Sequence, residues 1–326
     1  TNAGDSSVTM FDLKTLAPIK KIKIGTDGAD GIMYDAPSNT ILSINHSHPK
    51  GTAVVLDAKS GDVKGTIVLN SNAPEGGVGD GKGRIFINLE DKNAIDVVDM
   101  KSMKVTATWS IEPCDGPTGI AFDAKSNRII AGCSKKSVVV DAASGKVVAE
   151  IANGDGVDAL GYDPVEKLIY IPAGREGNVT VVHQDAPDKY TVKETVKTFA
   201  GAKTIAVDEA KHRAYVFTLE YGPAPAPAAG ASRAAGWPRR ARRSARSDRR
   251  VLVHHDRALI RVVHERAPAR EWAGALSVRP RTARAARPGR RTGGRRSDRP
   301  GDRPGDQGGR RGARRLPLRA ESPGWP

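Results

Sequence analysis

Five polar residues recur along the chain at nearly equal intervals and could together form a binding site. They are Asp30, Glu75, Thr118, Asp158 and Lys203. The intervals are 45, 43, 40 and 45 residues, and each residue lies five positions before an aspartate that closes a short segment. Three carboxylates, a hydroxyl and an amine at one point could bind a small molecule or a protein segment. Solvated loop residues without a ligand would produce the same pattern, so both interpretations stay open.

Two cysteines, Cys114 and Cys133, flank one pair of predicted strands. If the two strands are antiparallel, the ends that carry the cysteines lie close enough for a disulfide. Such a bond is typical of an oxidising compartment. The alternative is a pair of small, reduced core or loop residues. The spacing does not match a Cys-x-x-Cys redox or metal motif.

Two histidines, His46 and His48, stand two residues apart in the segment "NHSH". Metal ligation by this pair would need a third partner from elsewhere in the chain. We expect an exposed loop pair and predict no metal site or cofactor. No nucleophile elbow, phosphate-binding loop or zinc-binding helix motif occurs in the sequence.

A repeat of about 43 residues organises the first two thirds of the chain. Segments such as "ADGIMYD" and "PTGIAFD" are each followed by a β-type segment such as "TILSINH" or "RIIAGCS". A further Val-rich segment then ends at an aspartate, at Asp12, Asp57, Asp99 and Asp141. There the carboxylate and a nearby Ser or Thr hydroxyl can accept hydrogen bonds from turn N–H groups. A fourth segment, such as "KVTATWSI", completes the unit.

Four short antiparallel strands in each repeat predict an all-β fold, a β-propeller of four-stranded blades. The expected pieces are a half blade over residues 7–24, four full blades over 28–69, 73–111, 117–151 and 156–198, and a half blade over 202–219. The first strand of a blade lines the central channel. The five recurrent polar residues should therefore surround the channel mouth.

These repeats resemble the YVTN-type β-propeller repeats of YncE-like proteins, over residues 1–222 only. The segment "QDAPDKYTVKETVKTFAGAKTIAVDEAKHRAYVFTLEYGPAPAP" is similar to the last blade of bacterial members. The resemblance implies seven blades, of which about two would precede this chain. It also implies a ring-closing strand after "GPAPAP". "VLVHHDRALIRVV" is the only candidate, and it lacks the expected following turn, so we expect no outer strands in the last blade. Closure as a five-bladed ring is a less favoured alternative.

The composition changes abruptly after Gly222. Residues 1–222 carry 25 basic and 29 acidic residues, whereas residues 223–326 carry 27 basic and 8 acidic ones. All 27 bases of the second part are arginines, and that part lacks Lys, Phe, Tyr, Met and Asn. Arg, Ala, Gly and Pro have GC-rich codons, so we predict a disordered Arg/Pro/Gly-rich tail that is out of frame or non-native.

A natural basic tail and a folded basic domain are the alternatives for residues 223–326. Arginines would bind nucleic-acid phosphates with a strong salt dependence. The tryptophans of the tail do not alternate with its bases as a stacking surface requires, and no nucleic-acid-binding motif occurs. Non-specific binding of anions or nucleic acid by the tail is expected in each case.

The favoured function is a non-enzymatic, exported binding or scaffold module for an unknown small molecule or protein. The resemblance implies a periplasmic setting and single-stranded DNA binding, although the net charge of −4 over residues 1–222 disfavours a general nucleic-acid surface. The alternative is a propeller enzyme, either part of an oxidoreductase or a calcium-dependent lactonase. In a lactonase, Asp30, Glu75 and Asp158 would supply part of an oxygen cage for calcium.

The chain begins at Thr1 and contains no apolar run of signal-peptide or membrane-spanning length. We therefore expect a fragment of a periplasmic or secreted protein whose targeting segment would precede Thr1, and no membrane span.

Overall fold

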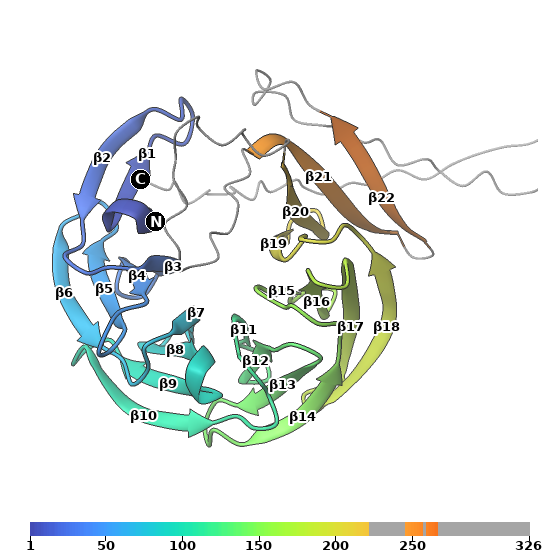
Figure 1. Cartoon of the computed structure of the whole chain (residues 1–326). Helices are drawn as coiled ribbons and strands as arrows, with labels where there is room; N and C mark the ends of the chain where they lie inside the picture. Colours follow the sequence, from blue (N-terminus) through green and yellow to red (C-terminus); the bar gives the residue numbers. More distant parts are fainter. Residues whose placement is uncertain (222–244, 257–258, 267–326) are drawn as a thin grey trace, which may run out of the picture. The chain divides into compact units, whose positions relative to one another are not determined.

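The computed structural model describes residues 1–221, 245–256 and 259–266, which form a succession of antiparallel sheets. Six sheets follow one another along the chain, and each is built from strands that are consecutive in sequence (Figure 1). The first sheet has two strands, β1 (Ser7–Phe11) and β2 (Pro18–Lys23). The helical elements of the described residues are two single 3₁₀ turns, η1 (Ala3–Asp5) and η2 (Glu90–Lys92).

Four complete blades follow, each with its four strands in simple sequence order. The second sheet contains β3 (Ala29–Asp35), β4 (Thr40–Asn45), β5 (Thr52–Asp57) and β6 (Val63–Val68). The third contains β7 (Pro74–Gly79), β8 (Arg84–Leu89), β9 (Ala94–Asp99) and β10 (Lys104–Ser110). The fourth contains β11 (Gly119–Asp123), β12 (Arg128–Gly132), β13 (Lys136–Asp141) and β14 (Val147–Ala152). The fifth contains β15 (Gly161–Asp163), β16 (Leu168–Ala173), β17 (Asn178–Ala186) and β18 (Lys189–Lys197). The predicted half blade and four full blades are confirmed.

The last sheet differs from the sequence-based expectation. Besides β19 (Thr204–Asp208) and β20 (Arg213–Tyr221), it contains β21 (Ala245–Asp256) and β22 (Leu259–Arg266). β21 pairs antiparallel with β20, and β22 pairs with β21. The expectation of a half blade without outer strands is therefore wrong. The β-branched residues of "VLVHHD" and "LIRVV" favour strands despite the surrounding arginines. The rest of the arginine-rich tail lies outside the described residues.

The first strands of successive sheets lie side by side. β3 contacts β7, β7 contacts β11, β11 contacts β15, and β15 contacts β19. These strands face the centre of the fold, and the fourth strands of the complete blades lie on its outside (Figure 1). Residues at the starts of the first strands are thereby brought together although they are about 43 positions apart in sequence.

The core lies between the faces of neighbouring sheets. Middle strands are buried on both faces, so they are almost continuously apolar, as in β8 and β12. Outer strands alternate between half-buried and exposed positions, as in β10. Phe86 of β8 is fully buried, and its ring centroid lies 5.9 Å from those of Trp109 and Phe122. Phe122 belongs to the next blade, so this aromatic cluster joins two sheets.

Aspartates close the turns as predicted. Asp57 accepts hydrogen bonds from the backbone N–H groups of Lys59 at 3.0 Å and Ser60 at 2.9 Å. The Ser60 N–H and the neighbouring Lys64 ammonium lower the pKa of Asp57 below its ordinary value. Asp12, Asp99 and Asp141 make equivalent bonds in their own turns.

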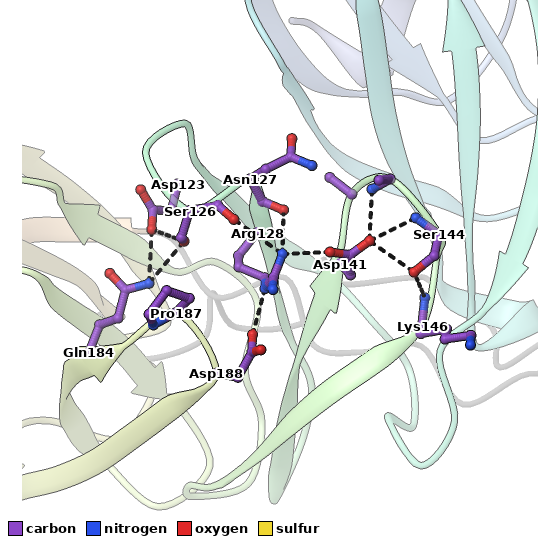
Figure 2. A network of polar contacts seen from close by, with 12 residues as sticks. Asp123, Ser126, Asn127, Arg128, Asp141, Ser144, Lys146, Gln184, Pro187 and Asp188 are labelled. Atoms are coloured by element: carbon purple, nitrogen blue, oxygen red, sulfur yellow. Dashed lines mark hydrogen bonds and ion pairs between the residues drawn. The ribbon is translucent and has the colours of Figure 1, made fainter.

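A polar network ties the fourth sheet to the fifth (Figure 2). Arg128 of β12 contacts Asp141 through Nη1 and Asp188 of the next blade through Nε, both at 2.6 Å. Gln184 of β17 donates a hydrogen bond to Asp123 at 2.8 Å. This network joins the β11–β12 and β13–β14 turns to the β17–β18 turn, at the end of the sheets opposite the recurrent polar residues.

Candidate functional site at the channel mouth

The five recurrent polar residues lie together in the structure. Asp30, Glu75, Thr118, Asp158 and Lys203 all line one cavity of about 490 Å³. Asp30 lies in β3 and Glu75 in β7, and the other three residues come just before β11, β15 and β19. The convergence expected from the repeat is present. That a ligand binds there stays a prediction.

Small residues after the polar positions let the inner strands approach closely. A Cβ atom on Gly119 would lie 2.5 Å from the backbone of Ala159 and Leu160 in the next blade. The N–H of Gly76 donates a hydrogen bond to the carbonyl of Thr118 at 3.1 Å, and a Cβ on Gly76 would lie 2.7 Å from that oxygen. Glycine is required here because the neighbouring backbone occupies the space of a side chain.

Thr118 serves the scaffold as well as the cavity. The residue is only 7% exposed, and its hydroxyl donates to the carbonyl of Val157 at 3.1 Å. The Asn88 amide donates to the carbonyls of Thr118 at 3.1 Å and Gly119 at 2.9 Å. The hydroxyl proton is thus used within the protein, and the Thr118 oxygen keeps only acceptor capacity toward a ligand.

Asp158 and Lys203 form an ion pair across neighbouring sheets. Lys203 Nζ lies 2.6 Å from Asp158 Oδ1, and both side chains are partly exposed. The pair neutralises one carboxylate of the channel mouth. Asp30, Glu75 and Asp158 line the same cavity, and Asp158 is the one of the three that has a lysine partner.

Glu75 is the most strongly perturbed acid of the channel. Its side chain is 19% exposed. Burial, together with the nearby carboxylates of Asp30, Glu90 and Asp158, raises the pKa of Glu75 to about 8. Glu75 is therefore largely protonated at neutral pH. It can donate a hydrogen bond, or it can ionise when a cation arrives.

His46 belongs to this site, contrary to the expectation of an exposed loop pair. His48 is exposed, but His46 is half-buried and its Nε2 atom lies 3.4 Å from Asp30 Oδ2 and 3.2 Å from Glu75 Oε1. His46 follows β4 directly, and β4 pairs with β3 so that Asn45 is opposite Ala29. The position of His46 in the sequence could have identified it. In an antiparallel pair, the end of the second strand of a blade lies beside the start of the first strand, where the recurrent polar residue is found.

A second cavity, of about 570 Å³, adjoins the first. It shares Glu75, Thr118, Asp158 and Lys203 with the first cavity and adds charged residues from the flanking loops. These additional residues are Glu90, Asp115, Lys135, Asp155 and Arg175. Arg175 pairs with Asp155 at 3.1 Å. Six carboxylates and three cationic side chains thus line the two cavities, an excess of acid that the five-residue pattern alone did not reveal.

Cys114, which precedes β11, and Cys133, which follows β12, form a disulfide beside the fourth sheet, with their Cα atoms 5.6 Å apart. Both residues are fully buried in the cluster that contains Phe86 and Ile129. A disulfide of this kind is typical of a non-cytoplasmic protein. Among the described residues, no helix has the length and apolar character needed to cross a membrane.

Comparisons with known proteins show the fold but no family. No family model and no curated protein matches the chain. A chain in the crystal structure of the mitotic checkpoint complex is similar, with a TM-score of 0.58 and 16% identity; the match covers 66% of each chain. A chain of Kuenenia stuttgartiensis hydrazine synthase is similar with a TM-score of 0.56 and 14% identity, over 79% of this chain and 70% of the other. Both similarities are to β-propeller-like folds, so the chain has an all-β, β-propeller-like fold.

Proposed function

We propose that this chain is an exported, non-enzymatic binding module of the YVTN-type β-propeller kind, with its binding site at the channel mouth. The ligand that suits the site best is a small polar molecule with positive charge, or a protein segment that carries such groups. The observation that supports this proposal is the excess of carboxylates around two adjoining cavities at the inner ends of successive sheets. Each of these cavities is within the usual size of a small-molecule site.

The charge distribution favours a cation over an anion. Asp158 and Asp155 already have cationic partners in Lys203 and Arg175. Glu75 is held in its protonated form by burial and by neighbouring carboxylates. A ligand ammonium group near Glu75 would relieve the repulsion and allow this residue to ionise, so binding should release a proton near neutral pH. A nucleic-acid phosphate would meet additional repulsion instead.

The enzyme alternative receives less support from this geometry than the binding module does. A calcium-dependent lactonase would use several oxygen ligands. Here Lys203 pairs with Asp158, and an imidazole nitrogen stands between Asp30 and Glu75. This arrangement fits recognition of a polar ligand better than an all-oxygen calcium cage.

The proposal predicts that a linear polyamine binds at the channel mouth. We expect calorimetric titration of the full chain with spermidine, at low salt and pH 7.5, to give one saturable site. Asp158→Asn leaves Lys203 uncompensated, so spermidine should bind at least about tenfold more weakly, equivalent to about 1.4 kcal/mol. Asp62→Asn is the matched control, because Asp62 forms an exposed ion pair with Lys20 and lines neither cavity.

Two results would contradict the proposal. One is equal spermidine affinity in wild type and Asp158→Asn, and the other is binding of citrate, a small anion, that is tighter than spermidine binding and is altered by Asp158→Asn. A binding measurement with labelled single-stranded DNA distinguishes the nucleic-acid alternative from the present proposal. If DNA binds and the Asp158 substitution alters its affinity, the channel is a nucleic-acid site and the present proposal fails.

A further inference from the structure

We infer that Asp30, His46 and Glu75 form a site for one divalent transition-metal ion, with zinc as the best-fitting example. The site lies in the channel wall between the β3–β6 sheet and the β7–β10 sheet. This inference goes beyond the proposed function, because it depends on a histidine outside the recurrent polar column and concerns an ion rather than a molecular ligand.

The donor atoms have the spacing of metal ligands. His46 Nε2 lies 3.2 Å from Glu75 Oε1 and 3.4 Å from Asp30 Oδ2, and all three donor atoms lie within 4.8 Å of one another. Ligand atoms bound tetrahedrally to zinc at about 2.0–2.1 Å lie roughly 3.3 Å from each other. Two of the three separations therefore match before any rearrangement.

The backbone holds these residues in place across two sheets. The N–H of His46 donates to the carbonyl of Gly28 at 2.9 Å. Gly28 has φ of +66°, and a Cβ atom there would lie only 2.1 Å from the carbonyl oxygen of His46, so glycine is needed for this approach. On the other side, a Cβ on Gly31 would lie 3.1 Å from the carbonyl oxygen of Glu75. Two close backbone approaches therefore fix the backbone from which the three side chains project.

The imidazole nitrogen that faces the carboxylates lacks a hydrogen-bond partner. His46 Nε2 has essentially no accessible surface, and its geometry gives no hydrogen bond to any described residue. A buried polar atom without a partner is costly, and a bound metal ion would supply the missing interaction.

The mixture of donors indicates the class of ion. Imidazole suits zinc and other first-row transition metals, whereas calcium is bound by oxygen ligands. The side chain of Asp30 is 56% exposed, so a water molecule can approach the cluster from the side of this carboxylate. Three protein ligands and a water would complete a four-coordinate ion.

The inference is tested by titrating the full chain with zinc against a competing colorimetric chelator at pH 7.5. We expect one equivalent of zinc to bind in the wild type, with an affinity at least about 30-fold weaker in His46→Ala. His48→Ala is the matched control and should bind like the wild type, because His48 is exposed and outside the cluster. Glu75→Gln should weaken zinc binding at least about tenfold, and circular dichroism shows that each variant is folded.

Three results would overturn the metal site. They are no zinc binding by the wild type, equal affinity in wild type and His46→Ala, and calcium binding that is as tight as zinc binding and unaffected by His46→Ala. The first would indicate that the imidazole serves only as an ion-pair partner of the two carboxylates. The test is separable from that of the proposed function, since Asp158 lies outside the three-residue cluster and Asp158→Asn, which should weaken spermidine binding, should still bind zinc.

Discussion

Replacing Cys114 and Cys133 together by alanine is expected to lower the free energy of unfolding by about 3 kcal/mol. The two residues are 19 positions apart, so the bond closes a loop of moderate length in the unfolded chain. Both are fully buried beside apolar residues, and alanine introduces no buried polar group there. The expected loss thus comes mainly from the released constraint, with a smaller share from the lost sulfur atoms.

Urea denaturation of the full chain measures this effect, and a reducing agent provides the control. The wild type in the presence of a phosphine reductant should lose most of the same stability, while the double variant should be insensitive to the reductant. Equal stability of wild type and double variant under oxidising conditions would show that the disulfide does not constrain the fold. It would also weaken the argument for an oxidising compartment.

Glu75→Gln is expected to stabilise the protein at alkaline pH and to have little effect near pH 5. The pKa of Glu75 is raised from an ordinary value near 4.5 to about 8, so between these values the folded state binds more protons than the unfolded state. The contribution of Glu75 to stability therefore falls as the pH rises from about 5 to above 8. The upper limit of this penalty is roughly 5 kcal/mol, and about 1–2 kcal/mol is expected because the side chain keeps contact with water.

The measurement compares thermal or urea unfolding of wild type and Glu75→Gln from pH 5 to pH 9. EDTA is present throughout, so that metal binding makes no contribution. Subtracting the two curves removes the other titrating groups, which are common to both proteins. A difference that is constant over this range would mean that Glu75 ionises in the folded protein as it does in the unfolded chain.

The blades could be predicted from the sequence because strand composition and turn residues both indicate the strands that the structure contains. The middle strands are continuous β-branched runs, and the turns carry aspartates such as Asp57 whose carboxylates bind turn N–H groups. The outer strands after residue 244 were missed. Their apolar segments are short and lie among arginines, and Arg257 and Ala258 between them are not typical turn residues. Residues Arg249 and Arg250 nevertheless pair with Thr218 and Phe217 through the backbone, which is indifferent to side-chain charge.

The convergence of the five polar residues could be predicted, because it follows from the repeat and from the inner position of each first strand. The hydrogen-bond and ion-pair partners of these residues could not be predicted. That Thr118 donates to Val157 and that Lys203 pairs with Asp158 depend on the offset between neighbouring sheets. His46 joins the site through the pairing of β3 with β4, which no single column of the repeat displays.

A second recurrent position in the repeat contains some of the carboxylates that line the cavities but lie outside the five-residue pattern. Asp115 and Asp155 each lie three residues before a member of the polar column, and both line the second cavity. Asp27 holds the same relative position in the first complete blade. An alignment of the loops before the first strands would therefore have identified the acidic surroundings, although not which carboxylates have cationic partners.

Whether spermidine binds at the channel mouth can be measured by hydrogen exchange of the full chain, followed by mass spectrometry with and without spermidine at low salt. We expect spermidine to slow amide exchange in peptides that cover the channel mouth, residues 28–33, 73–79, 155–160 and 201–205. The outer strands over 104–110 and 147–152 should exchange at the same rate with and without spermidine. Protection confined to outer turns such as residues 57–62, or no protection in the described part of the chain, would contradict a binding site at the channel mouth.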